Sequence, residues 1–139
     1  MEAKRLLPLL EAAHRGETAM VNELLVSGLD VNASNAEGLT ALMYAAIGGW
    51  PETAAALLAA EADVNQRARD GATALMKASL WGHAGVVSLL LRHGAEIEAR
   101  DSDGWTAITL ATEKGHTDVR QLLSEAWDAN SAIKKNRSL

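Results

Sequence analysis

The stretch that decides the fold is 70–79, DGATALMKAS, because the chain carries versions of it three times. Residues 37–46 (EGLTALMYAA) lie 33 positions earlier, and residues 103–112 (DGWTAITLAT) lie 33 positions later. A fixed period of this length indicates one small supersecondary unit that is copied and stacked. Since one such unit cannot bury its apolar face alone, its neighbours supply the core, and the expected product is an elongated solenoid.

Each copy of the unit predicts a turn followed by two short helices. The Gly that opens the unit suits a turn with positive φ, and the Thr two residues later is placed to cap a first helix. That first helix should end at the next Gly of each copy, namely Gly16, Gly49, Gly82 and Gly115. A second helix is expected over residues 53–59, 86–92 and 119–126.

The two prolines agree with this phasing. Proline is tolerated at the first position of a helix, where its missing N–H costs nothing. Pro8 is therefore expected to begin the first helix of an N-terminal unit, and Pro51 to begin a second helix.

The period divides the chain into a partial or capping repeat and three further repeats. Their expected bounds are 1–34, 35–67, 68–100 and 101–126. Residues 127–139 break the period. Trp127 is expected to fold back over the last repeat as part of a cap, and the rest to form a frayed or disordered tail.

The units resemble the ankyrin repeat, and the resemblance covers roughly residues 7–126. The segments that carry it are 73–76 (TALM), 82–83 (GH), 86–91 (VVSLLL) and 94–98 (GAEIE). The resemblance implies an all-α ankyrin-repeat solenoid of helix–turn–helix units with β-turn fingers. It also implies that the fingers and first helices form a concave face on which another protein binds.

Particular positions refine the resemblance. His83 and His116 occupy the second residue of the Gly-His motif and are expected to be structural, while Trp50 at the same position is structural or incidental. The Gly that follows a second helix is replaced by Glu61. A non-Gly residue in the left-handed conformation is disfavoured by about 1–2 kcal/mol, so we expect Glu61→Gly to stabilise the protein.

Composition limits the possible functions. The formal net charge of −5 argues against a nucleic-acid partner, and no apolar stretch is long enough to cross a bilayer. The chain has no cysteine, which excludes disulfides and thiol catalysis. We therefore expect a cytoplasmic protein that is monomeric alone and has no nucleic-acid or membrane partner.

The sequence contains no convincing catalytic or metal-binding set. Residues 11–14 spell E-x-x-H, but only once, whereas a di-metal site in a helical bundle needs two copies. Residues 101–104 match only the middle of a calcium loop. No catalytic residue, metal or cofactor is predicted.

The variable positions of the repeat predict the partner site. Trp81 and Trp105 are large where packing does not require it, and Trp and Arg are common binding hot spots. Three arginines lie near them in an acidic protein, which predicts a partner with an acidic and partly apolar patch. The candidate site comprises Leu39, Ile47, Arg67, Arg69, Asp70, Leu80, Trp81, Arg100, Asp103, Trp105 and Lys114. The opposing interpretation is that the two indoles pack on each other and the arginines are solvated.

We favour a non-enzymatic protein–protein interaction module, acting as an adaptor, inhibitor or immunity-type partner. The alternative is a structural or self-associating repeat scaffold. A small enzyme is less favoured because the sequence offers no nucleophile with its base.

Overall fold

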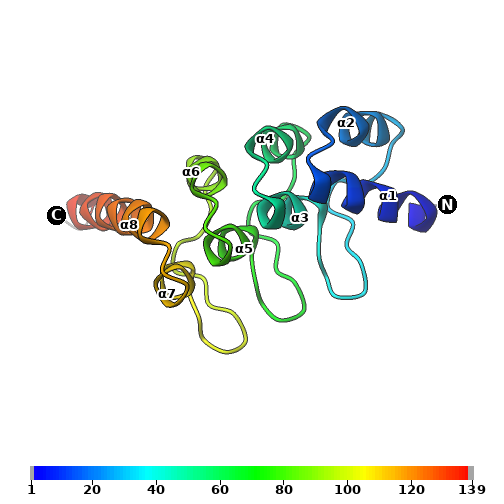
Figure 1. Ribbon diagram of the computed structural model, residues 1–139. Helices are drawn as coiled ribbons and strands as arrows, with labels where there is room; N and C mark the ends of the chain where they lie inside the picture. The colour runs from blue at the N-terminus through cyan, green and yellow to red at the C-terminus, as the bar shows by residue number, and fades with distance from the viewer. Residues whose placement is uncertain (1, 138–139) are drawn as a thin grey trace.

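The computed structural model describes residues 2–137, which form eight α-helices joined by turns and loops (Figure 1). Their bounds are α1 Glu2–Arg15, α2 Thr18–Val26, α3 Ala41–Gly48, α4 Pro51–Ala59, α5 Ala74–Leu80, α6 Ala84–Arg92, α7 Ala107–Glu113 and α8 Thr117–Arg137.

The helices stack in two rows that run the length of the molecule (Figure 1). The first helices α1, α3, α5 and α7 contact one another in succession, and α2, α4, α6 and α8 form the second row above them. Three loops project from the opposite side of the first-helix row. We call these loops finger 1 (residues 34–40), finger 2 (67–73) and finger 3 (100–106). The predicted all-α solenoid with β-turn fingers is confirmed.

The first helices α3, α5 and α7 begin directly after the predicted threonines. The hydroxyls of Thr40, Thr73 and Thr106 each accept a hydrogen bond of 3.3 Å from the backbone N–H three residues later. This bond satisfies one of the N–H groups that a helix start leaves without a partner. The threonines therefore fix where each first helix leaves its finger.

The core runs continuously between the two rows of helices. Leu57, Leu90 and Leu123, which share one repeat position, are completely buried in successive second helices. Each such side chain contributes roughly 1.5–3 kcal/mol through its removal from water. Ala45 and Ala78 are also completely buried, and their small size lets adjacent first helices approach closely.

A row of ring nitrogens links each repeat to the one before it. The Nε2 of His83 lies 2.9 Å from the carbonyl oxygen of Ile47, and that of His116 lies 3.0 Å from the carbonyl oxygen of Leu80. The predicted structural role of these histidines is thereby confirmed. Trp50 makes the same link, because its Nε1 donates over 2.7 Å to the carbonyl oxygen of His14.

The left-handed position after the second helix is also as predicted. Among the described residues Glu61 is the one non-glycine with positive φ, at 71°, and it matches Gly28 at 98° and Gly94 at 87°. The strain on which the stability prediction rests is therefore present.

Two expectations about the ends of the chain are wrong. Pro51 does open α4, but Pro8 lies inside α1, which begins at Glu2. Leu6 packs against the core and so extends α1 ahead of the proline. At the other end, α8 continues without interruption to Arg137, so the chain neither folds back at Trp127 nor becomes a disordered tail up to that residue. Part of that expectation, residues 138–139, lies outside the described residues.

Candidate functional site

Both candidate tryptophans lie at the surface. Trp81 is 56% exposed and is the residue that ends α5, while Trp105 is 38% exposed and lies at the end of finger 3, just before α7. Neither indole is sealed in the core. Trp81 follows the C-terminal end of α5 and Trp105 precedes the N-terminal end of the adjacent helix α7, so the two indoles lie near opposite ends of neighbouring first helices.

Comparison of equivalent positions shows that the fold does not require tryptophan at either place. The position of Trp81 is filled by Gly48 one repeat earlier and by Lys114 one repeat later. The position of Trp105 is filled by Leu39 and Ala72 in the preceding fingers. Because repeats of the same conformation form without an indole there, the two tryptophans are surface decorations of the scaffold.

The arginines are partly engaged by the fingers themselves. One Nη of Arg67 donates to the carbonyl oxygens of Gly71, at 3.2 Å, and of Arg100, at 2.7 Å. Arg69 donates over 3.2 Å to the carbonyl oxygen of Ala36 in finger 1. All three side chains remain exposed, and each guanidinium carries five N–H donors. The arginines therefore brace the fingers while retaining donors for a partner.

The structure brings some candidate residues together and separates others. Leu39, Arg69 and Asp70 line one hollow of about 310 Å³ between fingers 1 and 2, and the half-buried Lys77 of α5 forms its wall. Arg67 lines a different hollow, of about 690 Å³, which lies beside α8. The sequence had suggested that the three arginines form one patch, and this is wrong because Arg69 lines a different hollow from Arg67 and Arg100.

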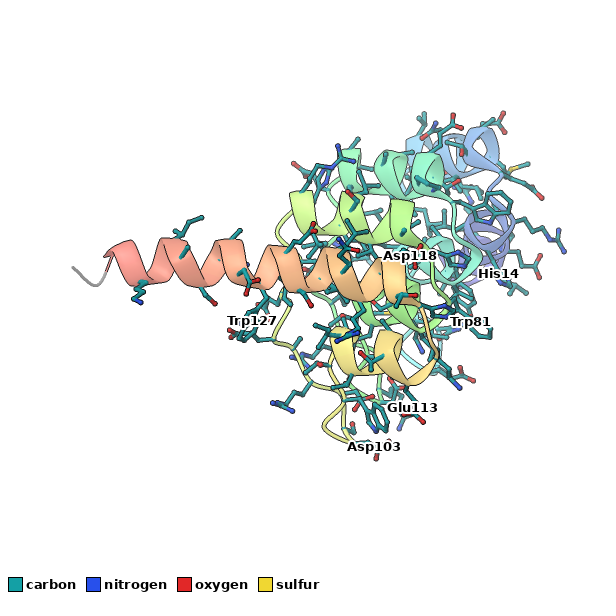
Figure 2. All side chains as sticks on the ribbon, turned by 60° about the vertical axis from the view of Figure 1, so that its left-hand side comes forward. His14, Trp81, Asp103, Glu113, Asp118 and Trp127 are labelled. Atoms are coloured by element: carbon teal, nitrogen blue, oxygen red, sulfur yellow. The ribbon has the colours of Figure 1, made fainter. Side chains whose placement is uncertain are left out.

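The remaining candidates lie along the ends of the first helices or at a finger tip. Ile47, Leu80 and Lys114 lie at the ends of α3, α5 and α7 that face away from the fingers, in the row that includes Trp81. Asp103 lies at the tip of finger 3, far below Trp81 in Figure 2. The candidate residues thus form a finger group and a helix-end group on the same row of repeats.

Sequence reasoning missed an apolar hollow at the N-terminal end of the finger side. Its volume is about 290 Å³, and its lining comprises Leu6, Leu7, Leu10, Glu11, His14, Asn35 and Tyr44. The Tyr44 hydroxyl accepts a hydrogen bond of 3.1 Å from the Asn35 amide, which holds the phenol at the wall. The run of leucines in a terminal first helix was the signal that could have revealed this hollow.

The described residues also show what the surface lacks. Residues 2–137 contain no group of three or more His, Asp or Glu side chains arranged to hold a metal ion. None of the described helices is long and apolar enough to cross a membrane. Arg15 and Glu17 form an ion pair of 3.9 Å at the surface of the N-terminal repeat.

Stacked helix pairs with projecting fingers and an exposed, variable face define the class of helical repeat proteins. Within that class the family model for ankyrin repeats, in three copies, matches residues 9–101. The chain therefore belongs to the ankyrin-repeat family, whose members are generally protein–protein interaction modules and typically not enzymes. No curated protein matches the chain.

Proposed function

We propose that this protein is a non-enzymatic interaction module that grips another protein on its fingers and first helices, as an adaptor, inhibitor or immunity-type partner. The observation that carries the proposal is the exposure of two indoles, Trp81 and Trp105. The equivalent positions of the other repeats hold Gly, Ala, Leu or Lys, so the fold does not require an indole there. An exposed indole contributes nothing to the core, whereas a buried interfacial indole is among the strongest contributors to binding.

The charges near the indoles indicate the chemistry of the partner. Lys77 is half-buried beside Arg69, and no carboxylate of the described chain lies within ion-pairing distance of either. An acidic group on a partner would gain the interaction that the chain itself does not supply. The leucine-lined hollow beside Tyr44 offers an apolar contact on the same side. We therefore propose a partner surface that is acidic and partly apolar.

The test compares a double tryptophan variant and a control variant with the parent protein. Tagged protein is used to capture partners from its native lysate, mass spectrometry identifies them, and the purified partner is then titrated against each variant. The double change Trp81→Ala with Trp105→Ala is expected to abolish capture of that partner, because hot-spot losses reach several kcal/mol.

Ile133→Ala is the control, since this apolar side chain is also largely exposed (53%) but lies in the C-terminal part of α8, outside the candidate site. Helical circular dichroism should be the same in all variants. Retained binding by the double variant would reject this surface as the interaction site.

One observation favours the alternative of a self-associating scaffold. The N-terminal repeat exposes Leu7, Met20 and Val26, the last of them 87% exposed. Apolar side chains that remain exposed at the end of a solenoid can pack against another copy. Light scattering over a range of protein concentrations distinguishes the two functions, because only the scaffold would show a mass that rises with concentration.

A further inference from the structure

Each of the first two fingers is covered by the finger that follows it. The backbone N–H of Arg69 in finger 2 donates over 3.0 Å to the carbonyl oxygen of Glu37 in finger 1. The N–H of Ser102 in finger 3 donates over 2.8 Å to the carbonyl oxygen of Asp70 in finger 2. The fingers therefore build an edge-to-edge ladder in which each supplies the acceptor for the next.

The glycines at the finger tips show how tightly this edge is filled. A β-carbon placed on Gly38 would lie 2.9 Å from the backbone nitrogen of Arg69, and one on Gly71 would lie 3.0 Å from that of Ser102. Backbone of the next finger thus packs directly against each tip.

Finger 3 has the same shape but an open edge. Gly104 has a φ of 84°, close to 78° at Gly38 and 83° at Gly71, so the tip turns in the same way. A β-carbon on Gly104, however, would meet no described atom of the chain within 4 Å. The carbonyl oxygen of Asp103, which corresponds to those of Glu37 and Asp70, receives no hydrogen bond from residues 2–137. Because the chain continues as α8, no described segment takes the place of a fourth finger.

An arginine donor faces the same edge. Arg67 in finger 2 donates both to its own finger, at Gly71, and across to the carbonyl oxygen of Arg100 in finger 3. Arg100 repeats the first of these bonds, to Gly104 at 3.0 Å. Arg100 makes no bond equivalent to the one that Arg67 makes to the next finger, because the described part of the chain has no acceptor at that place. Finger 3 therefore presents one backbone acceptor and one guanidinium donor to whatever lies beside it.

The part of α8 that continues beyond the last repeat, from residue 127 onward, places an apolar side chain beside this edge. Trp127 extends from α8 toward the finger side of the molecule (Figure 2). Its indole forms a wall of a hollow of about 710 Å³, together with Ile97, Ile108 and Arg100. Ile97 is buried and Ile108 half-buried, so a side chain in this hollow would find apolar surface on several sides.

We propose that this C-terminal edge binds an extended segment of another protein, which adds a further finger to the ladder. The segment donates a backbone N–H to the Asp103 carbonyl oxygen, offers a carbonyl oxygen to Arg100 and places an apolar side chain against Trp127. Main-chain hydrogen bonds at an exposed edge supply affinity in this mode of recognition, and side-chain pockets supply specificity.

A second copy of this chain fits the edge poorly. To dock there, a second copy would have to donate a finger N–H to the Asp103 carbonyl oxygen. In fingers 2 and 3 the equivalent N–H groups, those of Arg69 and Ser102, already donate within their own molecule. The equivalent N–H of finger 1 makes no such bond, but the neighbouring Asn35 lines the N-terminal hollow together with the leucines of α1. Helix α1 therefore stands where the docking molecule would have to approach, and an extended segment of a different protein is the better occupant.

The experiment uses the full chain and a phage-displayed library of random linear dodecapeptides as the probe. Selection on the parent protein is expected to enrich peptides whose affinity falls at least about tenfold on Trp127→Asp and again on Arg100→Gln. Ile133→Asp is the matched control, because it places the same charge at an exposed apolar position of α8 that lines neither of the hollows beside Trp127, and it should leave these affinities unchanged. In amide NMR spectra the selected peptides should shift Gly104 and the Trp127 indole.

The proposal is overturned if no peptide is enriched, or if the enriched peptides are insensitive to Trp127→Asp. It is also overturned if sedimentation shows that the protein alone self-associates and that Trp127→Asp abolishes this, because the occupant would then be a second copy. Trp127 is exposed on an overhanging helix, so its substitution should not prevent folding, and unchanged thermal unfolding verifies this. Failure at this edge leaves the interaction through Trp81 and Trp105 untouched, so the two proposals are judged separately.

Discussion

The middle of the solenoid and its C-terminal end are built from the same repeat, but they differ in burial. Helix α5 buries five of its seven residues, whereas α7, also of seven residues, buries two. Met76 is 2% exposed in α5, and its equivalent in α7, Thr109, is exposed. Gly82 is met by the ring of His116 from the next repeat, while a β-carbon on Gly115 would meet no described atom within 4 Å.

The difference shows that a repeat position has no fixed role of its own. At the position of Met76 and Thr109, an apolar methionine is suitable where the next first helix buries it, and a polar threonine is suitable where the position is exposed to solvent. Thr109 also completes a reciprocal cap with Thr106, a bond that Met76 cannot make. The end of the stack thus replaces packing from a neighbour with local hydrogen bonding.

The largest expected effect comes from opening a cavity in the middle of the stack. Leu90→Ala should lower the free energy of unfolding by about 2–5 kcal/mol, because the side chain is completely buried among residues that cannot collapse fully around the void. Ile133→Ala, in the overhanging part of α8 and 53% exposed, is the control and should change stability by less than about 0.5 kcal/mol. Equal losses in urea unfolding would show that the end is packed as tightly as the middle.

A smaller effect of opposite sign is expected where the repeats differ in backbone strain. Glu61→Gly should raise the free energy of unfolding by about 1 kcal/mol and the melting temperature by a few degrees, because glycine adopts the left-handed conformation without steric cost. Gly94→Glu is the reverse control at the equivalent position. Its β-carbon would meet no described atom within 4 Å, so the expected loss reflects strain alone. A melting temperature of Glu61→Gly at or below that of the parent would contradict this account.

The smallest effect concerns the ring that joins the first two repeats. Trp50→Phe keeps an aromatic ring at the same position but removes the N–H that donates to His14. Because this hydrogen bond is exposed to water, its loss should cost only about 0.5 kcal/mol. Trp81→Phe removes an indole N–H for which the structure shows no acceptor and should be nearly neutral. Calorimetry on both variants is the measurement, and an equal cost for the two would mean that the bond to His14 does not stabilise the junction.

Much of the fold could be predicted because its determinants are local or periodic. The capping threonines, the turn glycines and the strained Glu61 each act on the backbone within a few residues, so their spacing was enough to place them. The structural histidines followed from the repeat motif. Pro8 was misplaced because Leu6, which extends α1 ahead of it, is held by packing rather than by a local signal.

The candidate site was less predictable. That Trp81 and Trp105 are exposed agreed with the sequence analysis, but the division of the arginines did not follow from it. Residues two apart in an extended segment would share a face, but the turn at the tip of finger 2 begins at Arg69, so the side chains of Arg67 and Arg69 line different hollows. Whether these residues bind a partner stays a prediction.

The sequence by itself determined the repeat, the order of helices and fingers and the ends of most helices, because a strict period reports a unit whose internal contacts are short-range. Only the tertiary structure decided which hydrogen-bonding groups and which apolar surfaces of each unit are not covered by its neighbours. The shared role of Trp50, His83 and His116, the open edge at Asp103 and the hollow beneath Trp127 all arise between segments about one repeat apart. Such features depend on how a repeat meets its neighbour, and at the last repeat on having none.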